Sequence, residues 1–98
     1  MGASIEYVVQ SGDILGDVSA DECDPVASAR AYADLLRPAL EAAFPEDEVT
    51  VCVERTSGGR TLRVHGDLSE RREREIETRV REIAGDLWTR PDSWLVAV

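Results

Sequence analysis

The chain has no lysine, a single histidine, two cysteines and no long hydrophobic run. Cys23 and Cys52 are too few for a disulfide framework and lack the paired spacing of a zinc or redox motif. No segment approaches the roughly 20 apolar residues of a membrane span. Residues 1–12 lack the basic start and the apolar stretch of a signal peptide. We therefore expect a cytoplasmic protein without a membrane anchor.

The side chains that are present give little support to enzyme chemistry. His65 would be the only histidine base for a serine or cysteine nucleophile, and it is predicted on the outward face of a strand beside Arg63. Cys52 alternates with two valines and so should face the other side of the sheet, as an inert thiol. Gly58 and Gly59 lack the spacing of a phosphate-binding loop. We predict a non-enzymatic protein with no catalytic residues and no cofactor.

Charge is the most unbalanced property of the chain. The 98 residues hold 20 acids and 11 arginines, for a net charge of −9. Residues 1–54 contain 12 acids and two arginines, a net −10, whereas residues 55–98 contain 8 acids and nine arginines, a net +1. An acidic surface disfavours direct binding to nucleic acid and suits a basic partner or mimicry of a nucleic acid, although it also serves plain solubility.

The apolar pattern predicts the element order β-α-β-β-α. Residues 4–10 and 49–53 alternate with the period of a strand. Asp24 should cap a helix in which apolar residues recur at spacings of three and four up to residue 43. Pro38 should kink this helix or divide it into two pieces, because proline removes a hydrogen bond and clashes with the preceding turn.

The second half of the pattern continues with a turn, a strand and a helix. Residues 57–59 carry the small-residue signal of a hairpin. A short strand at 62–64 ends at Gly66, and a cap at Asp67 or Ser69 starts a helix that Pro91 stops.

These elements predict an α+β fold over a single domain, residues 1–98. It would have a βαββα order, with a three-stranded mixed sheet and two helices packed on one face. A right-handed crossover would make the first two strands parallel, while the strand order stays open. The predicted core contains Leu36, Leu40, Val51, Val64, Val80 and Ile83.

Two charged segments have alternative interpretations. The acidic loop contains Asp13, Asp17, Asp21, Glu22 and Asp24, but its spacing does not match a calcium-binding EF-hand loop, so we predict no metal site. The last helix offers three acid-first pairs four residues apart, which are typical of a solvated helix face: Glu70 with Arg74, Glu75 with Arg79, and Glu77 with Arg81. Trp88 and Trp94 are predicted to pack at the core or its edge, unless an exposed ring anchors an interface.

Three segments together resemble the DinI family of DNA-damage-inducible proteins. Residues 43–51 (AFPEDEVTV) resemble the family's junction between helix and strand. A small-residue turn and a glycine before the last helix follow. Residues 82–88 (EIAGDLW) and 91–96 (PDSWLV) resemble its closing helix, with five residues between two tryptophans. The element order also agrees, so the resemblance covers almost the whole chain.

The resemblance implies a partner and a binding site. Proteins of that family bind the recombinase RecA and modulate its filament on single-stranded DNA in the SOS response to DNA damage. Their acidic C-terminal helix is thought to imitate a DNA backbone. Matching position to position, the resemblance implies Glu82, Asp86 and Asp92 as partner-binding residues, with RecA or another basic nucleic-acid-binding protein as the partner.

An alternative function uses the other acids. A phage-encoded or mobile-element-encoded inhibitor could act as a DNA mimic against a host nuclease or defence complex. It would then use residues 13–24 and 46–48, where most of the acid excess lies.

Overall fold

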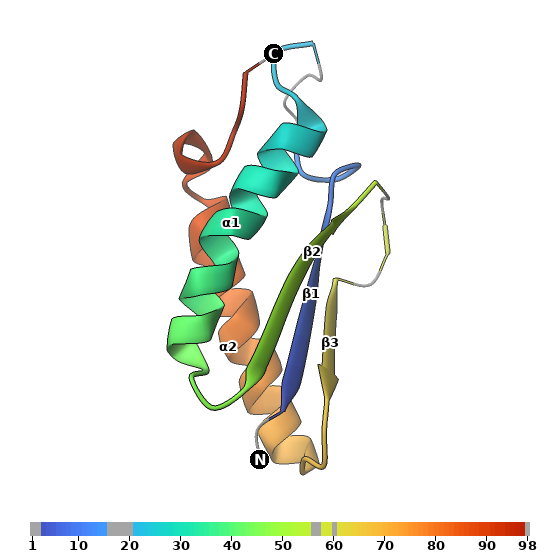
Figure 1. Cartoon of the computed structure of the whole chain (residues 1–98), viewed down its shortest axis with the longest axis vertical. Helices are drawn as coiled ribbons and strands as arrows, with labels where there is room; N and C mark the ends of the chain where they lie inside the picture. Colours follow the sequence, from blue (N-terminus) through green and yellow to red (C-terminus); the bar gives the residue numbers. More distant parts are fainter. Residues whose placement is uncertain (1–2, 16–20, 56–57, 60, 98) are drawn as a thin grey trace.

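The computed structural model describes residues 3–15, 21–55, 58–59 and 61–97. Its elements confirm the predicted α+β class and the order βαββα (Figure 1). The strands are β1 (Ser4–Gln10), β2 (Glu48–Glu54) and β3 (Leu62–His65), and the helices are α1 (Pro25–Ala43), α2 (Glu70–Trp88) and the short 3-10 helix η1 (Pro91–Ser93).

The three strands are ordered β2-β1-β3, so β1 is the central strand. β1 runs parallel to β2 and antiparallel to β3. The predicted hairpin between β2 and β3 is therefore wrong, because β1 lies between them. Gly58 still turns the chain with φ 68°, and Gly59 is held beside the end of β1 by two hydrogen bonds with the Gln10 side chain. A glycine turn gives the same sequence signal whether it joins two neighbouring strands or two strands that lie on either side of a third.

Helix α1 begins as predicted and continues through its internal proline. The Asp24 carboxylate accepts hydrogen bonds from the backbone N–H groups of Val26 and Ala27, at 3.0 and 3.1 Å. The predicted division at Pro38 is wrong, since one helix runs from Pro25 to Ala43. Pro38 and Asp34 both lie on the exposed side of α1. Water can therefore satisfy the Asp34 carbonyl that loses its helical partner.

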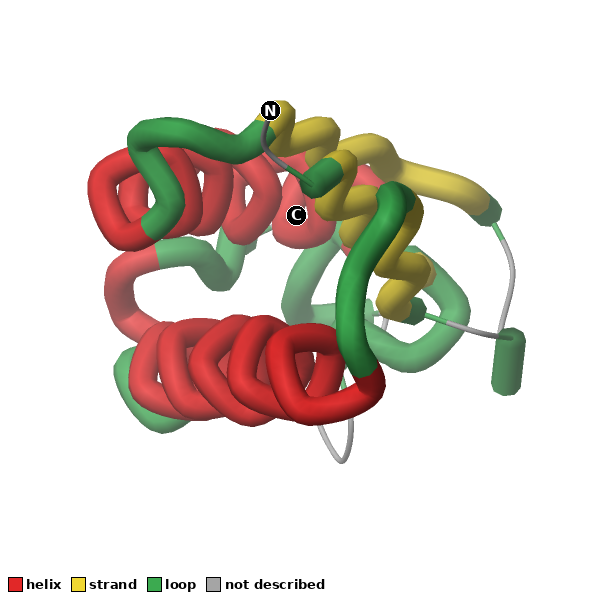
Figure 2. The backbone as a smooth tube through the Cα atoms, turned by 90° about the horizontal axis from the view of Figure 1, so that it is seen from below, coloured by secondary structure: helices red, strands yellow, loops and turns green. Residues whose placement is uncertain are grey.

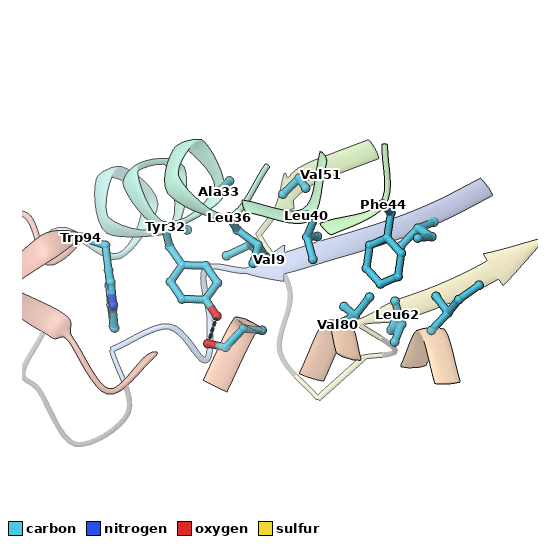
Figure 3. Close-up of a cluster of buried hydrophobic side chains, with 14 of the residues drawn as sticks. Val9, Tyr32, Ala33, Leu36, Leu40, Phe44, Val51, Leu62, Val80 and Trp94 are labelled. Atoms are coloured by element: carbon cyan, nitrogen blue, oxygen red, sulfur yellow. Dashed lines mark hydrogen bonds between the residues drawn. The ribbon is translucent and has the colours of Figure 1, made fainter. Parts of the chain in front are cut away.

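Both helices lie on the same side of the sheet (Figure 2), and the core forms between them and the strands (Figure 3). Four of the predicted core residues are buried: Leu36, Leu40, Val51 and Val80. Val64 and Ile83 are only partly buried at the margin of this core, which also includes Tyr32, Phe44, Ile76 and Trp94. Among the described residues, no helix is both long and apolar enough to cross a membrane.

The N-terminal cap of α1 provides a first test of this fold. Asp24→Ala should lower the free energy of unfolding by about 0.5–2 kcal/mol, because two backbone donors lose their acceptor. Thermal and urea unfolding would measure the change. Glu22→Ala is the matched control, since Glu22 is an exposed acid two residues away. An equal loss of stability in both variants would contradict the capping role.

Candidate partner-binding surface on the C-terminal helix

Helix α2 presents one apolar face to the core and its other sides to solvent. Ser69 caps it through a hydrogen bond from the Arg72 N–H to the Ser69 hydroxyl, at 3.2 Å, which decides between the two predicted caps. Ile76, Val80 and Ala84 are its buried residues. Burial of this face orients the helix, so each exposed position of α2 lies on a defined side of it.

Glu82, Asp86 and Asp92, the three acids that the resemblance implies, are all exposed. Glu82 and Asp86 are four residues apart on α2 and so lie on one side of the helix, about 6 Å apart along its axis. Asp92 follows in η1. The helix thus brings two of the three carboxylates together, and the third lies in the next element.

The segment that carries Asp92 is held against the helices. Trp94 is 3% exposed, and its indole N–H donates to the Leu87 carbonyl at 3.0 Å. Further along, the Val96 N–H donates to the Ser28 hydroxyl at 2.9 Å, and the Val96 carbonyl accepts from the Asp24 N–H at 2.8 Å. Asp92 therefore follows α2 on a docked segment and not on a free tail.

The ion pairs along α2 differ from those predicted. None of the three acid-first pairs is formed within the described residues. Instead, Arg71 and Arg72 contact Glu75, and Arg79 contacts Glu82 at 3.4 Å. Two of these pairs are three residues apart, and Arg71 lies four residues before Glu75 in the base-first order. Both arrangements are accessible on a helix, and the prediction considered only acid-first pairs four residues apart. Arg79 partly neutralises Glu82, whereas Asp86 and Asp92, the other two of the three acids, form no ion pair with the residues that the structure describes.

Several acids of the alternative surface, residues 13–24 and 46–48, form contacts within the chain. Asp13 accepts from the Gly58 N–H at 2.8 Å, and Asp24 caps α1. Asp47 accepts from the Ala3 N–H at 2.7 Å and lies 3.8 Å from Arg72, with a side chain only 8% exposed. Asp17 lies outside the described residues.

The other acids of this alternative lie in two separate clusters. Asp21 and Glu22 precede the start of α1, whereas Glu46 and Glu48 follow its end. A helix of 19 residues spans about 28 Å. The two clusters therefore lie at opposite ends of α1.

His65 and Cys52 lie where the alternation predicts. His65 is exposed on β3. Cys52 is partly buried, its thiol lies 3.8 Å from the Tyr7 carbonyl, and burial together with the nearby Glu54 raises its pKa. A raised pKa leaves less of the nucleophilic thiolate at neutral pH. Within the part of the chain that the structure describes, no three His, Cys, Asp or Glu side chains are grouped to hold a metal ion.

The chain matches no model of a known protein family, no curated protein and no solved structure. Its likeness to the DinI family therefore consists of the short motifs and the element order. The observed fold has the βαββα order that the resemblance implies.

Proposed function

We propose that this protein is a non-enzymatic modulator of the RecA filament, which it binds through Glu82, Asp86 and Asp92. The observation that supports this most directly is the pair of exposed carboxylates one turn apart on α2, followed by a third in η1. Carboxylates accept charge-assisted hydrogen bonds from arginine and lysine, as phosphates do. A basic groove that binds a nucleic-acid backbone is thus a suitable partner for this surface.

The rigidity of the surface adds to its suitability. The two helical acids lie on a helix that buries its opposite face, and Trp94 docks the segment carrying the third. A surface that is ordered before binding loses little conformational entropy when a partner engages it. The partner therefore meets a defined arrangement of charges.

Binding to the filament is the direct test of this function. The wild-type chain should bind RecA assembled on single-stranded DNA at low salt, and its affinity should fall as ionic strength rises, because salt screens exposed charges. Fluorescence anisotropy of the labelled protein would measure the affinity. Naked single-stranded DNA is the control, and the net charge of −9 predicts no binding to it.

Two outcomes would contradict the proposal. If the protein fails to bind the filament even at low salt, RecA is not its partner. If it binds naked DNA as well as the filament, the acids do not act as a phosphate substitute. In the first of these cases, the inhibitor of a host nuclease or defence complex would become the leading alternative, to be tested by whether the protein blocks DNA binding by a purified nuclease.

A further inference from the structure

A second feature of α2 lies on a different side of the helix from the acids. A cleft of about 220 Å³ is lined by Tyr7, Tyr32, Arg81, Ala84, Gly85 and Trp88. Arg81, Gly85 and Trp88 follow one another at spacings of four and three, so they form one row. This row is rotated by roughly 100° from the row of Glu82 and Asp86. A second cavity, of about 120 Å³, shares Tyr7, Tyr32 and Trp88 with this cleft.

Trp88 is the aromatic side chain that the cleft presents to solvent. It is 43% exposed, although it is a large hydrophobic residue. Its ring stacks on the buried Trp94, with centroids 5.0 Å apart, and meets Tyr32 edge-on at 6.1 Å. These contacts hold the ring on two sides, so Trp88 would lose little side-chain freedom on contact with a partner.

The floor of the cleft is equally ordered. The Tyr32 hydroxyl donates to the Ala84 carbonyl at 2.7 Å, which ties α1 to α2 (Figure 3). Tyr7 on β1 lines the cleft beside Tyr32. The cleft therefore lies over a rigid junction of both helices and the central strand.

Gly85 points to an approach from outside the chain. Glycine inside a helix is less favourable than alanine. One use of glycine is to let another group approach the backbone closely, in the space of the missing Cβ. A Cβ built on Gly85 would meet nothing within 4 Å, so internal packing does not require the glycine. The bare helix backbone at this position leaves room for a group that belongs to another molecule.

Arg81 gives the cleft its charge. Arg71, Arg72 and Arg79 contact carboxylates, whereas Arg81 forms no ion pair within the described residues. Arg81 lines the cleft together with Tyr7, Tyr32 and Trp88, which places its side chain beside the aromatic wall. An unpaired arginine beside an apolar wall complements a carboxylate that is attached to an apolar group.

We propose that this cleft is a docking site for a partner protein segment that carries an aromatic or large aliphatic side chain next to a carboxylate. The apolar side chain contacts Trp88 and the backbone at Gly85, while the carboxylate pairs with Arg81. Stacking of a nucleic-acid base on Trp88 is the competing occupant. Arg81 is the only cation among the residues that line the cleft, whereas a nucleic-acid strand brings a phosphate with every base and needs a row of cations. The docking site uses a different side of α2 from the acidic surface, so it does not depend on RecA binding.

A peptide titration tests this site without RecA. The probe is acetyl-Glu-Phe-Glu-amide, added to the ¹⁵N-labelled full chain and followed by amide and indole resonances. We expect the Trp88 indole and the Gly85 amide to shift with a Kd of about 1 mM. Acetyl-Lys-Phe-Lys-amide and acetyl-Glu-Ala-Glu-amide should bind at least about threefold more weakly, because each lacks one half of the recognised group. Equal binding of all three peptides, or no shift with any, would overturn the proposal.

Two variants separate binding from folding. Gly85→Ala should raise the melting temperature by a few degrees, through better helix propensity, and yet weaken peptide binding severalfold. Arg81→Gln should abolish the preference for the acidic peptide, whereas Arg74→Gln, at another exposed arginine of α2, should leave it unchanged. A stabilised Gly85→Ala variant with unchanged binding would contradict the close approach at this helix. If the Trp88 indole resonance shifts more with oligo-dT than with any of the peptides, the cleft binds nucleic acid and the proposed protein partner is wrong.

Discussion

Leu40→Ala should lower the free energy of unfolding by about 2–5 kcal/mol. Leu40 is fully buried between α1 and the sheet. The substitution removes apolar contacts and leaves a cavity that a close-packed core can only partly fill. Natural domains are stable by about 5–15 kcal/mol, so the variant loses a large share of its stability and should melt at a clearly lower temperature. Urea unfolding followed by tryptophan fluorescence would measure the change.

Leu35→Ala is the matched control for this variant. It makes the same substitution in the same helix, but Leu35 is 39% exposed and should cost less than about 1 kcal/mol. Ile83→Ala should fall between the two, because Ile83 is only partly buried at the margin of the core. If the two leucine variants unfold at the same urea concentration, the helix face assigned to the core is wrong.

The element order could be predicted because hydrophobic periodicity reports local structure. The spacing of Leu36 and Leu40 identifies one face of α1, and the alternation in residues 49–53 identifies β2, without knowledge of the partners that these residues contact. Asp24 and Ser69 could be proposed as caps because a short polar side chain before a helix accepts a hydrogen bond from the first backbone N–H groups of that helix. These predictions depend on residues that are close in the chain.

The strand order and the hairpin could not be predicted in the same way. The choice of β1 as the central strand depends on side chains that meet only after folding, such as Gln10, which bonds Gly59 across 49 residues. Nor could the sequence predict that α1 continues through Pro38, because this depends on the exposure of Asp34 and not on the proline itself. Long-range context overrides local propensity at such positions.

The candidate site shows the same division. The exposure of Glu82 and Asp86 follows from the helical pattern, since they lie away from the row of Ile76, Val80 and Ala84. The pairing of Arg79 with Glu82 does not, because an arginine can reach a carboxylate three or four residues away on either side. Nor could the sequence show that Trp94 would be buried while Trp88 stays exposed on top of it.

Neutralising the three acids together should weaken binding to the RecA filament by roughly tenfold. The variant combines Glu82→Gln, Asp86→Asn and Asp92→Asn. Each exposed charge pair contributes up to about 0.5 kcal/mol, and about 1.4 kcal/mol corresponds to a tenfold change in affinity. Binding of the variant should also depend less steeply on salt, because fewer charges remain to be screened. Anisotropy titrations at several ionic strengths would measure both quantities.

The same variant should fold almost as well as the wild type. Glu82 loses only an exposed contact with Arg79, in which both side chains are more than half exposed. Asp86 lies near the C-terminal end of α2, where a negative charge opposes the helix dipole, so its neutralisation should offset part of any loss. We therefore expect a melting temperature within a few degrees of the wild type, which separates a binding defect from unfolding.

The control must remove three charges without disturbing the structure. Asp13 is unsuitable, because its carboxylate holds the Gly58 N–H. Asp34, Glu41 and Glu46 are exposed and form no polar side-chain contact within the described residues, so the control combines Asp34→Asn, Glu41→Gln and Glu46→Gln. It makes the net charge less negative by the same three charges, and it should leave filament binding within about twofold of the wild type. If it weakens binding as much as the first variant does, total charge attracts the filament, and the C-terminal helix is not the binding site.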